Sequence, residues 1–125
     1  MIDEMLYELP YLNYWEFFLQ LCGRRKKLRI IGFSMQPTLN PGEEFLMNPR
    51  AYLKRSPQVN DIVVIFHPQQ PSLRIIKRIA KIEKGDRYFL LGDNLQHSDD
   101  SRSFGLIERK QIIGKLTTRA NFLNE

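Results

Sequence analysis

Two hydrophobic patterns divide the chain, and the first has the period of a helix. Residues 11–22 are mostly apolar or aromatic, and their polar members Asn13, Glu16 and Gln20 recur three to four positions apart. This predicts a helix with one narrow polar stripe that ends at Gly23. It is too short to cross a bilayer, which takes about 20 apolar residues. We expect its apolar face to pack on the protein's own core, with a lipid surface or a protein partner as the alternative.

From residue 28 onward, short apolar runs alternate with turns rich in proline, glycine and asparagine. The predicted strands cover residues 28–33, 43–47, 61–66, 73–83, 87–91 and 111–118. The run 61–66 is apolar enough to be buried on both faces of a sheet. A mainly β fold follows, a barrel or a sandwich-like sheet after a short N-terminal helix. The chain then divides into residues 1–27, an amphipathic helix with a basic linker, and residues 28–125, the β domain.

Lys77 stands out in the predicted strand 73–83. In a strand it shares one face with Leu73, Ile75 and Ile79, so a lysine lies in an apolar row. Either its amine reaches water along the alkyl stem, or the apolar surroundings lower its pKa and keep it neutral. A neutral lysine accepts a proton from a serine hydroxyl, whereas an ammonium does not.

Ser34 has an unusual local setting. It follows an apolar run that ends in Gly32, and Pro37 stands three residues after it. Glycine permits backbone angles that other residues avoid, and proline fixes φ. Ser34 is therefore expected at a rigid corner, either as an ordinary turn residue or as a nucleophile. A third polar segment, residues 92–105, reads as a long loop held by its own Asp and Ser side chains.

Composition narrows the chemistry. The 125 residues carry a formal net charge of +5, which suits an anionic partner. Much of that charge lies in residues 24–29, a solvated linker or a contact for anionic lipid head groups. No zinc-finger, RRM or helix-turn-helix signature accompanies it, so nucleic acid is not the expected partner. The single cysteine, Cys22, fits a reducing compartment, and with His67 and His97 it makes a poor metal set. We expect no metal and no cofactor, and residues 1–10 lack the pattern of a secretory signal.

Four segments, in this order, resemble a known family. They read Gly-Phe-Ser-Met-Gln-Pro-Thr-Leu at residues 32–39, Asn-Asp-Ile-Val-Val at 60–64, Ile-Lys-Arg-Ile at 76–79 and Gly-Asp-Asn…Ser-Asp-Asp-Ser-Arg-Ser-Phe-Gly at 92–105. Together they closely resemble the signal peptidase I family of Ser-Lys endopeptidases. The resemblance implies a coiled, barrel-like β sheet with an extended peptide-binding groove.

The resemblance also implies catalytic roles for residues in these segments. Ser34 would be the nucleophile and Lys77 the general base. Ser98 would hydrogen-bond to the lysine and orient it, while Asp100 and Arg102 would support the loop through an ion pair. Ser-Lys pairs are a known variant of serine catalysis that needs no histidine.

The serine segment would also form the oxyanion site and part of the substrate groove. The residues concerned are Gly32, Phe33, Met35 and Pro37. Many family members carry a serine as a second oxyanion donor two positions before the nucleophile, where this chain has Gly32. The backbone N–H of Ser34 is then the natural donor, and any second donor is a backbone group or water.

The resemblance implies a serine endopeptidase that removes an N-terminal leader from a precursor protein. The chain is most similar to a compact, anchorless subgroup, the nickel-type superoxide dismutase maturation proteases. We therefore expect a cytoplasmic protein, with peripheral contact to a membrane left open. One alternative is a general signal peptidase attached peripherally to the membrane while it cleaves exported preproteins. The other is a non-enzymatic basic β-module that binds lipid or nucleic acid.

Overall fold

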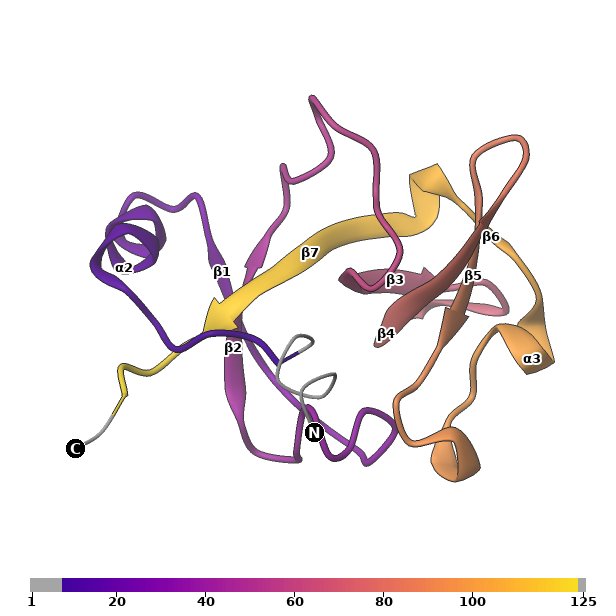
Figure 1. Ribbon diagram of the computed structural model, residues 1–125, viewed down its shortest axis with the longest axis horizontal. Helices are drawn as coiled ribbons and strands as arrows, with labels where there is room; N and C mark the ends of the chain where they lie inside the picture. The colour runs from indigo at the N-terminus through magenta and orange to yellow at the C-terminus, as the bar shows by residue number, and fades with distance from the viewer. Residues whose placement is uncertain (1–7, 124–125) are drawn as a thin grey trace.

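The computed structural model describes residues 8–123, and its main element is one antiparallel β-sheet. In chain order the elements are α2 (Tyr14–Leu21), β1 (Lys26–Arg29), β2 (Glu44–Asn48), β3 (Ile62–His67), β4 (Gln70–Glu83), β5 (Arg87–Leu91), η1 (Leu95–His97), α3 (Ser101–Phe104), β6 (Ile107–Glu108), η2 (Arg109–Gln111) and β7 (Ile112–Arg119). The strands lie in the order β1-β2-β7-β3-β4-β5-β6. Figure 1 shows α2 at the end of the sheet near β1 and β7, and α3 at the opposite end beside β5.

The mainly β fold with a short N-terminal helix is confirmed, and the sheet is open. Among the described residues β1 and β6 are its edges, with no hydrogen-bonded ladder between them. Four predicted strands lie within one residue of β2, β3, β5 and β7. Strand β4 is also confirmed, although it begins earlier, at Gln70. The two-residue strand β6 was not predicted.

The first predicted strand was wrong in its bounds. Strand β1 covers Lys26–Arg29, so it lies inside the basic run, and residues 31–33 are outside the sheet. Ile30 still exchanges backbone hydrogen bonds with the turn at Gly42 and Glu43. The chain then bends at Gly32, whose φ of +84° belongs to the region that glycine adopts without strain. This bend directs Ser34 away from the β1 ladder.

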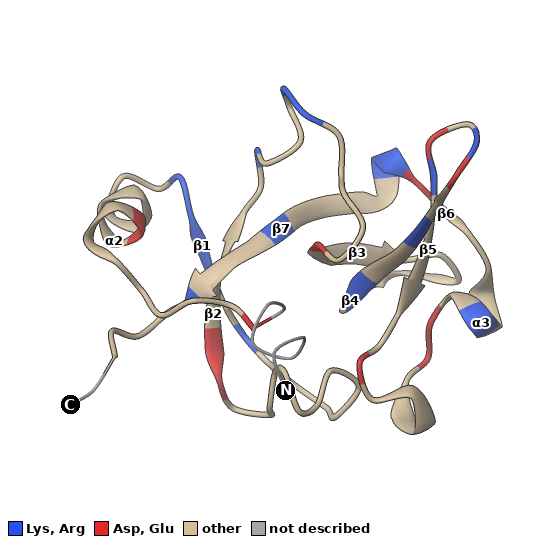
Figure 2. Ribbon diagram, in the orientation of Figure 1, with Lys and Arg blue, Asp and Glu red and all other residues tan. Residues whose placement is uncertain are grey.

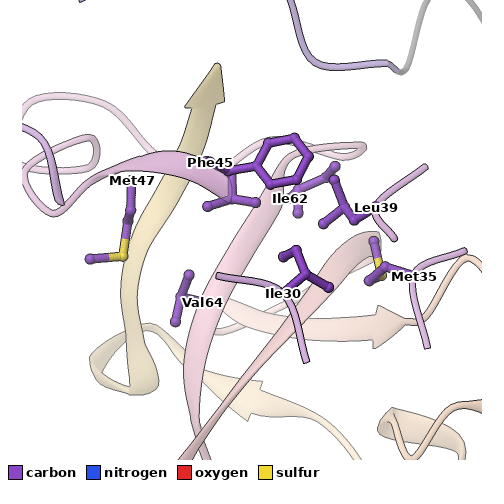
Figure 3. Packing of buried hydrophobic residues seen from close by; sticks show 8 residues of the cluster. Ile30, Met35, Leu39, Phe45, Met47, Ile62 and Val64 are labelled. Atoms are coloured by element: carbon purple, nitrogen blue, oxygen red, sulfur yellow. The ribbon is translucent and has the colours of Figure 1, made fainter. Parts of the chain in front are cut away.

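The core lies on both faces of β3, as the apolar run predicted. Ile62 and Val64 belong to one buried cluster, whereas Val63 and Ile65 belong to the other. Figure 3 shows the first cluster, in which residues of β2 and β3 meet Met35 and Leu39 from the serine segment. Met35 and Leu39 therefore anchor the segment after Ser34 to the sheet, and Ile30 of the same cluster anchors the segment before it.

Helix α2 contacts the domain through its polar stripe. Asn13 caps its N-terminus by accepting a hydrogen bond from the Glu16 backbone N–H at 2.8 Å. Glu16 is only 8% exposed, and its carboxylate accepts hydrogen bonds from Arg25 at 2.9 and 3.0 Å and from Thr117 at 2.6 Å. These bonds connect the helix to β7 and to the residue just before β1.

The expectation that the apolar face of the helix packs on the core is wrong. Its large apolar side chains are exposed: Tyr14, Trp15, Phe17, Phe18 and Leu21. The physical reason is the bonding of Glu16, because turning the helix over would remove three hydrogen bonds from its carboxylate. No helix within residues 8–123 is long and apolar enough to cross a membrane.

Candidate active site

Ser34 lies in a turn that is clamped from the far end of the chain. The backbone N–H of Asn94 donates to the Ser34 carbonyl at 2.9 Å, and the Asn94 side chain donates to the Phe33 carbonyl at 3.1 Å. Met35 is buried directly after the serine and accepts a weak hydrogen bond from the Asp93 backbone N–H through its sulfur, at 3.4 Å. Two adjacent loop residues thus position three consecutive residues of the turn.

Lys77 reaches Ser34 from the middle of β4. Its Nζ lies 2.9 Å from the Ser34 Oγ, at hydrogen-bond distance. The lysine is only 4% exposed and stands opposite Val63 of β3. Burial lowers the pKa of Lys77 from its ordinary value of 10.5, and the charges of Asp100 and Asp99 act in the opposite direction without cancelling that shift. The site therefore favours the neutral amine, the form that accepts a proton from a hydroxyl.

Asp100 and Arg102 hold the loop that covers this pair. The Arg102 guanidinium donates to both carboxylate oxygens of Asp100, at 2.9 and 3.0 Å, and the Gly92 backbone N–H donates at 3.0 Å. Burial alone would raise the pKa of Asp100, but the hydrogen bonds from Arg102 and Gly92 hold it at about 2. Arg102 also donates to the carbonyl of Leu95 at 2.6 Å. The buried carboxylate is thus ionised at neutral pH and ties the two ends of the loop together.

Ser98 lies close to the pair, but its hydroxyl makes no hydrogen bond of ordinary geometry with the described residues. A Cβ added to Gly92 would collide with the Ser98 Oγ and stand 2.6 Å from the Ser34 carbonyl oxygen. Glycine at position 92 therefore allows Ser98 to approach the backbone of the nucleophile's turn. The structure places Ser98 beside Ser34, and its expected bond to Lys77 is not among those formed.

Asp93 is a site residue that sequence reasoning did not single out. Its carboxylate accepts hydrogen bonds from the Thr38 hydroxyl at 2.6 Å and from two nitrogens of Arg78 at 2.8 Å each. It thus joins the serine segment, β4 and the loop after β5. The signal was present in the sequence, because these three residues lie within segments that resemble the signal peptidases. Asp93, Asn94 and Gly92 are the Gly-Asp-Asn that opens the loop.

A cleft beside the pair separates the serine segment from β4. It has a volume of about 260 Å³. Its lining residues are Arg29, Ile30, Ile31, Gly32, Ser34, Met35, Leu73, Arg74, Ile75, Ile76 and Lys77. Of the residues expected at the oxyanion site and groove, Gly32 and Met35 line it, whereas Phe33 and Pro37 are exposed outside this lining. The Ser34 backbone N–H donates no hydrogen bond to any residue in 8–123, so it is available to an incoming oxyanion.

The residues that the structure describes offer no metal centre. No group of three or more His, Cys, Asp or Glu side chains among them is arranged to hold an ion. His67, which is buried, instead accepts the backbone N–H of Gln69 on Nδ1 and pairs with Asp99 through Nε2 at 2.8 Å.

A buried lysine at hydrogen-bond distance from a serine, beside an open cleft in a β scaffold, is the arrangement of serine peptidases that use lysine in place of histidine. The family model "Signal peptidase, peptidase S26" matches residues 18–87 and 80–120. The chain belongs to this family of serine endopeptidases.

Three proteins similar to this chain agree with the family assignment. Mitochondrial inner membrane protease subunit 1 of Schizosaccharomyces pombe is 32% identical over 107 residues, which cover 70% of this chain and 68% of that protein. Mitochondrial inner membrane protease subunit 2 of Danio rerio is 34% identical over 109 residues, covering 70% of this chain and 59% of the other. Signal peptidase IB of Staphylococcus aureus is 55% identical over 38 residues, 30% of this chain and 19% of that enzyme. The chain thus spans only part of the length of these relatives.

Proposed function

We propose that this chain is a Ser-Lys endopeptidase that removes an N-terminal leader from a precursor protein. The observation that carries the proposal is the 2.9 Å contact between the Lys77 Nζ and the Ser34 Oγ, made by a buried lysine whose pKa is lowered. In the reaction, the neutral amine takes the hydroxyl proton as the Ser34 oxygen attacks the scissile carbonyl. The Ser34 backbone N–H stabilises the oxyanion, and Lys77 passes the proton to the leaving amine.

The second half of the reaction uses the same groups. Water replaces the released amine, and Lys77 takes its proton as the water oxygen attacks the acyl carbonyl on Ser34. Collapse of the tetrahedral intermediate breaks the ester bond, and Lys77 returns the proton to the serine oxygen. Every proton moves between the substrate, water, Ser34 and Lys77, so no metal or cofactor is needed.

The cleft supports an extended peptide as the substrate. Strand β5 pairs with β4 only from Arg78 onward, which leaves one edge of residues 73–77 without a neighbouring strand among the described residues. Segment 29–34 lines the opposite wall of the cleft. A peptide in β conformation pairs with free backbone groups of this kind, and its carbonyl then lies beside Ser34.

The finer proposal is the precursor of a nickel-type superoxide dismutase as the substrate. Its support is the resemblance of the serine, lysine and final loop segments to the maturation proteases of that enzyme. Incubation with this precursor and with exported preproteins, followed by mass spectrometry of the new N-termini, tests the choice. Cleavage of only the preproteins would overturn the dismutase assignment while leaving the endopeptidase in place.

The decisive variant is Ser34→Ala, with Ser56→Ala in an exposed loop as the matched control. We expect Ser34→Ala to lower the cleavage rate by about 10³-fold or more while its thermal midpoint stays near that of the wild type. Ser56→Ala is expected to cleave at the wild-type rate. Normal cleavage by the Ser34→Ala protein would show that another residue is the nucleophile.

A second candidate function is a signal peptidase that acts while attached peripherally to a membrane. The exposed face of α2 favours this candidate. Tyr14 and Phe17 of the helix contact Phe122, with ring centroids 5.3 and 5.8 Å apart, so these three aromatic side chains form one continuous surface. Between Leu9 and Gly42 the only carboxylate is Glu16, which is buried, whereas the basic residues 24, 26, 27 and 29 are exposed. Aromatic side chains beside such charge suit the interface of an anionic bilayer.

Sedimentation with phosphatidylcholine vesicles, with and without phosphatidylglycerol, separates the two candidates. Peripheral attachment predicts binding that requires the anionic lipid, weakens with salt and is lost in Trp15→Ser/Phe18→Ser. A protein that stays in the supernatant under all these conditions would favour the first candidate, a cytoplasmic endopeptidase. Concentration-dependent dimers lost in the same variant would instead assign the face to a second copy of the chain.

A further inference from the structure

The cleft beside Ser34 continues into a second hollow along the same two walls. The second hollow has a volume of about 310 Å³ and is lined by Lys27, Leu28, Arg29, Ile31, Val64, Arg74 and Ile76. Arg29, Ile31, Arg74 and Ile76 line both hollows. We call the combined feature the substrate groove. It runs from the Ser34–Lys77 pair towards β1.

The substrate groove carries an excess of positive charge. Besides Lys77, its lining includes the basic residues Lys27, Arg29 and Arg74, and none of the described residues that line it is acidic. Glu44 lies near the rim, 4.0 Å from the Lys27 amine and 3.6 Å from the Arg29 guanidinium, in pairs that are largely exposed. Figure 2 shows the basic residues on β1 and β4 and the acidic residue on β2.

Arg74 differs from the other basic residues of the groove. Its side chain forms no hydrogen bond or ion pair with any residue in 8–123, although it contributes to both hollows. Lys27 and Arg29 share the carboxylate of Glu44, so this negative charge is already paired with two basic residues. The positive charge of Arg74 is therefore left uncompensated by residues 8–123. An arginine in this position is available for a carboxylate that arrives with the substrate.

The position of Arg74 in β4 determines which residue of a bound peptide its guanidinium can contact. It precedes Lys77 by three residues in β4, which is about 10 Å along a strand. A peptide in the groove advances by about 3.3 Å per residue, and the arginine side chain adds several ångströms of reach. The carboxylate would therefore belong to a residue three to five positions from the scissile bond.

We propose that Arg74, assisted by Arg29, selects precursors that carry Asp or Glu about three to five residues from the scissile bond, on the side of the substrate that occupies the groove. This inference rests on the proposed function and adds an acidic substrate class to it. Arg74 is then a specificity-determining residue outside the chemical step. Its guanidinium contributes to substrate binding and takes no part in proton transfer.

The test uses peptides that span the mapped cleavage site and carry Glu, Gln or Lys at one position at a time, on both sides of the bond. We expect Glu to exceed Gln in kcat/KM by about threefold or more at one position three to five residues from the bond, with Lys below Gln. The preference should shrink with added salt. In Arg74→Gln the ratio of kcat/KM between the Glu and Gln peptides should fall to about one.

Arg50→Gln, an exposed arginine in the turn after β2, is the matched control and should keep the full preference. Equal cleavage of Glu and Gln peptides at every position, or a preference that survives in Arg74→Gln, would overturn the proposal.

A binding experiment separates this proposal from the proposed function. Fluorescein-labelled peptides of alternating alanine and serine, with one central Glu or Gln, are titrated into the Ser34→Ala protein and its Arg74→Gln derivative. Tighter binding of the Glu peptide that depends on Arg74 supports the inference even where no peptide is cleaved. Equal binding of both peptides contradicts it even where cleavage by Ser34 is established.

Discussion

Helix α2 and strand β4 each bury one ionisable side chain, and the two side chains differ in the partners that compensate their burial. Glu16 of α2 is 8% exposed and Lys77 of β4 is 4% exposed. The Glu16 carboxylate has a bidentate partner in Arg25 and a third hydrogen bond from Thr117. The only hydrogen-bond partner of the Lys77 amine among the described residues is the Ser34 hydroxyl.

The difference in partners separates a structural charge from a reactive one. Hydrogen bonds and an opposite charge compensate the ionised form of Glu16, so the helix retains an ion pair. No carboxylate within residues 8–123 lies at hydrogen-bond distance from the Lys77 amine, and burial therefore favours the form without charge. A buried group with a perturbed pKa beside a cleft is the arrangement expected of a functional site.

The largest expected effect comes from changing the charge state of Lys77. We expect Lys77→Arg and Lys77→Met both to reduce cleavage by about 10³-fold or more, because arginine stays protonated and methionine cannot accept a proton. In the wild type, kcat/KM should rise as the pH increases through the lowered pKa of Lys77 and fall as the pH drops below it. Lys81→Arg, an exposed position on the same strand, is the control. Full activity of Lys77→Arg would contradict the role of general base.

The next largest effect is expected on stability, when the carboxylate of Glu16 is removed. Glu16→Ala leaves Arg25 without its carboxylate, and we expect the free energy of unfolding to fall by about 3 kcal/mol. A double-mutant cycle with Arg25→Ala should give less than the sum of the two single changes. Glu83→Ala, which removes an exposed partner of Lys81, should change stability by less than about 0.5 kcal/mol. Equal effects of the two glutamate variants in urea denaturation would show that the α2 ion pair is not stabilising.

Removing the buried amine of Lys77 should raise the free energy of unfolding, whereas removing the carboxylate of Glu16 lowers it. Its pKa is lower in the folded chain than in the unfolded one, so below pH 10.5 folding must release a proton or bury a charge. We expect Lys77→Met to raise the unfolding free energy at pH 7 by about 1 kcal/mol, and the gain to shrink as the pH approaches 10.5. Urea denaturation of both proteins at the two pH values measures this. A gain that is independent of pH would mean that methionine improves packing alone.

The smallest effect is expected on the exposed face of α2. Trp15 is 64% exposed, so Trp15→Ser/Phe18→Ser should change the unfolding free energy by less than about 0.5 kcal/mol per site. Leu116→Ala, which opens a cavity in the first core cluster, should cost about 3 kcal/mol. Thermal and urea unfolding provide the comparison. A loss of similar size in both proteins would show that the helix is held by its aromatic side chains rather than by Glu16.

Most strands could be predicted because their signals are local in the sequence, whereas the roles of Ser34 and Lys77 were implied by the resemblance of their segments to the signal peptidases. β-branched runs bounded by turn residues located most strands to within one residue, and the two-residue period placed Lys77 in an apolar row. The Ser34 turn also follows from its neighbours, since Gly32 adopts a positive φ there. The clamp formed by Asp93 and Asn94 joins positions more than 50 residues apart, and no periodicity reports contacts of that kind.

The sequence by itself determined that this is a mainly β protein with a serine and a lysine in segments typical of one peptidase family, and the structure decided that the lysine is buried. It also indicated a helix with a polar stripe within residues 11–22, but the predicted bounds were too wide, because α2 begins at Tyr14 after its cap Asn13 and ends at Leu21. Only the tertiary structure decided which face of that helix meets the domain. Hydrophobicity favours burying the aromatic side chains, but the partners of Glu16, Arg25 and Thr117, come from other parts of the fold. The same holds for Ser34 and Lys77, because 43 residues separate them in sequence and folding brings them to 2.9 Å.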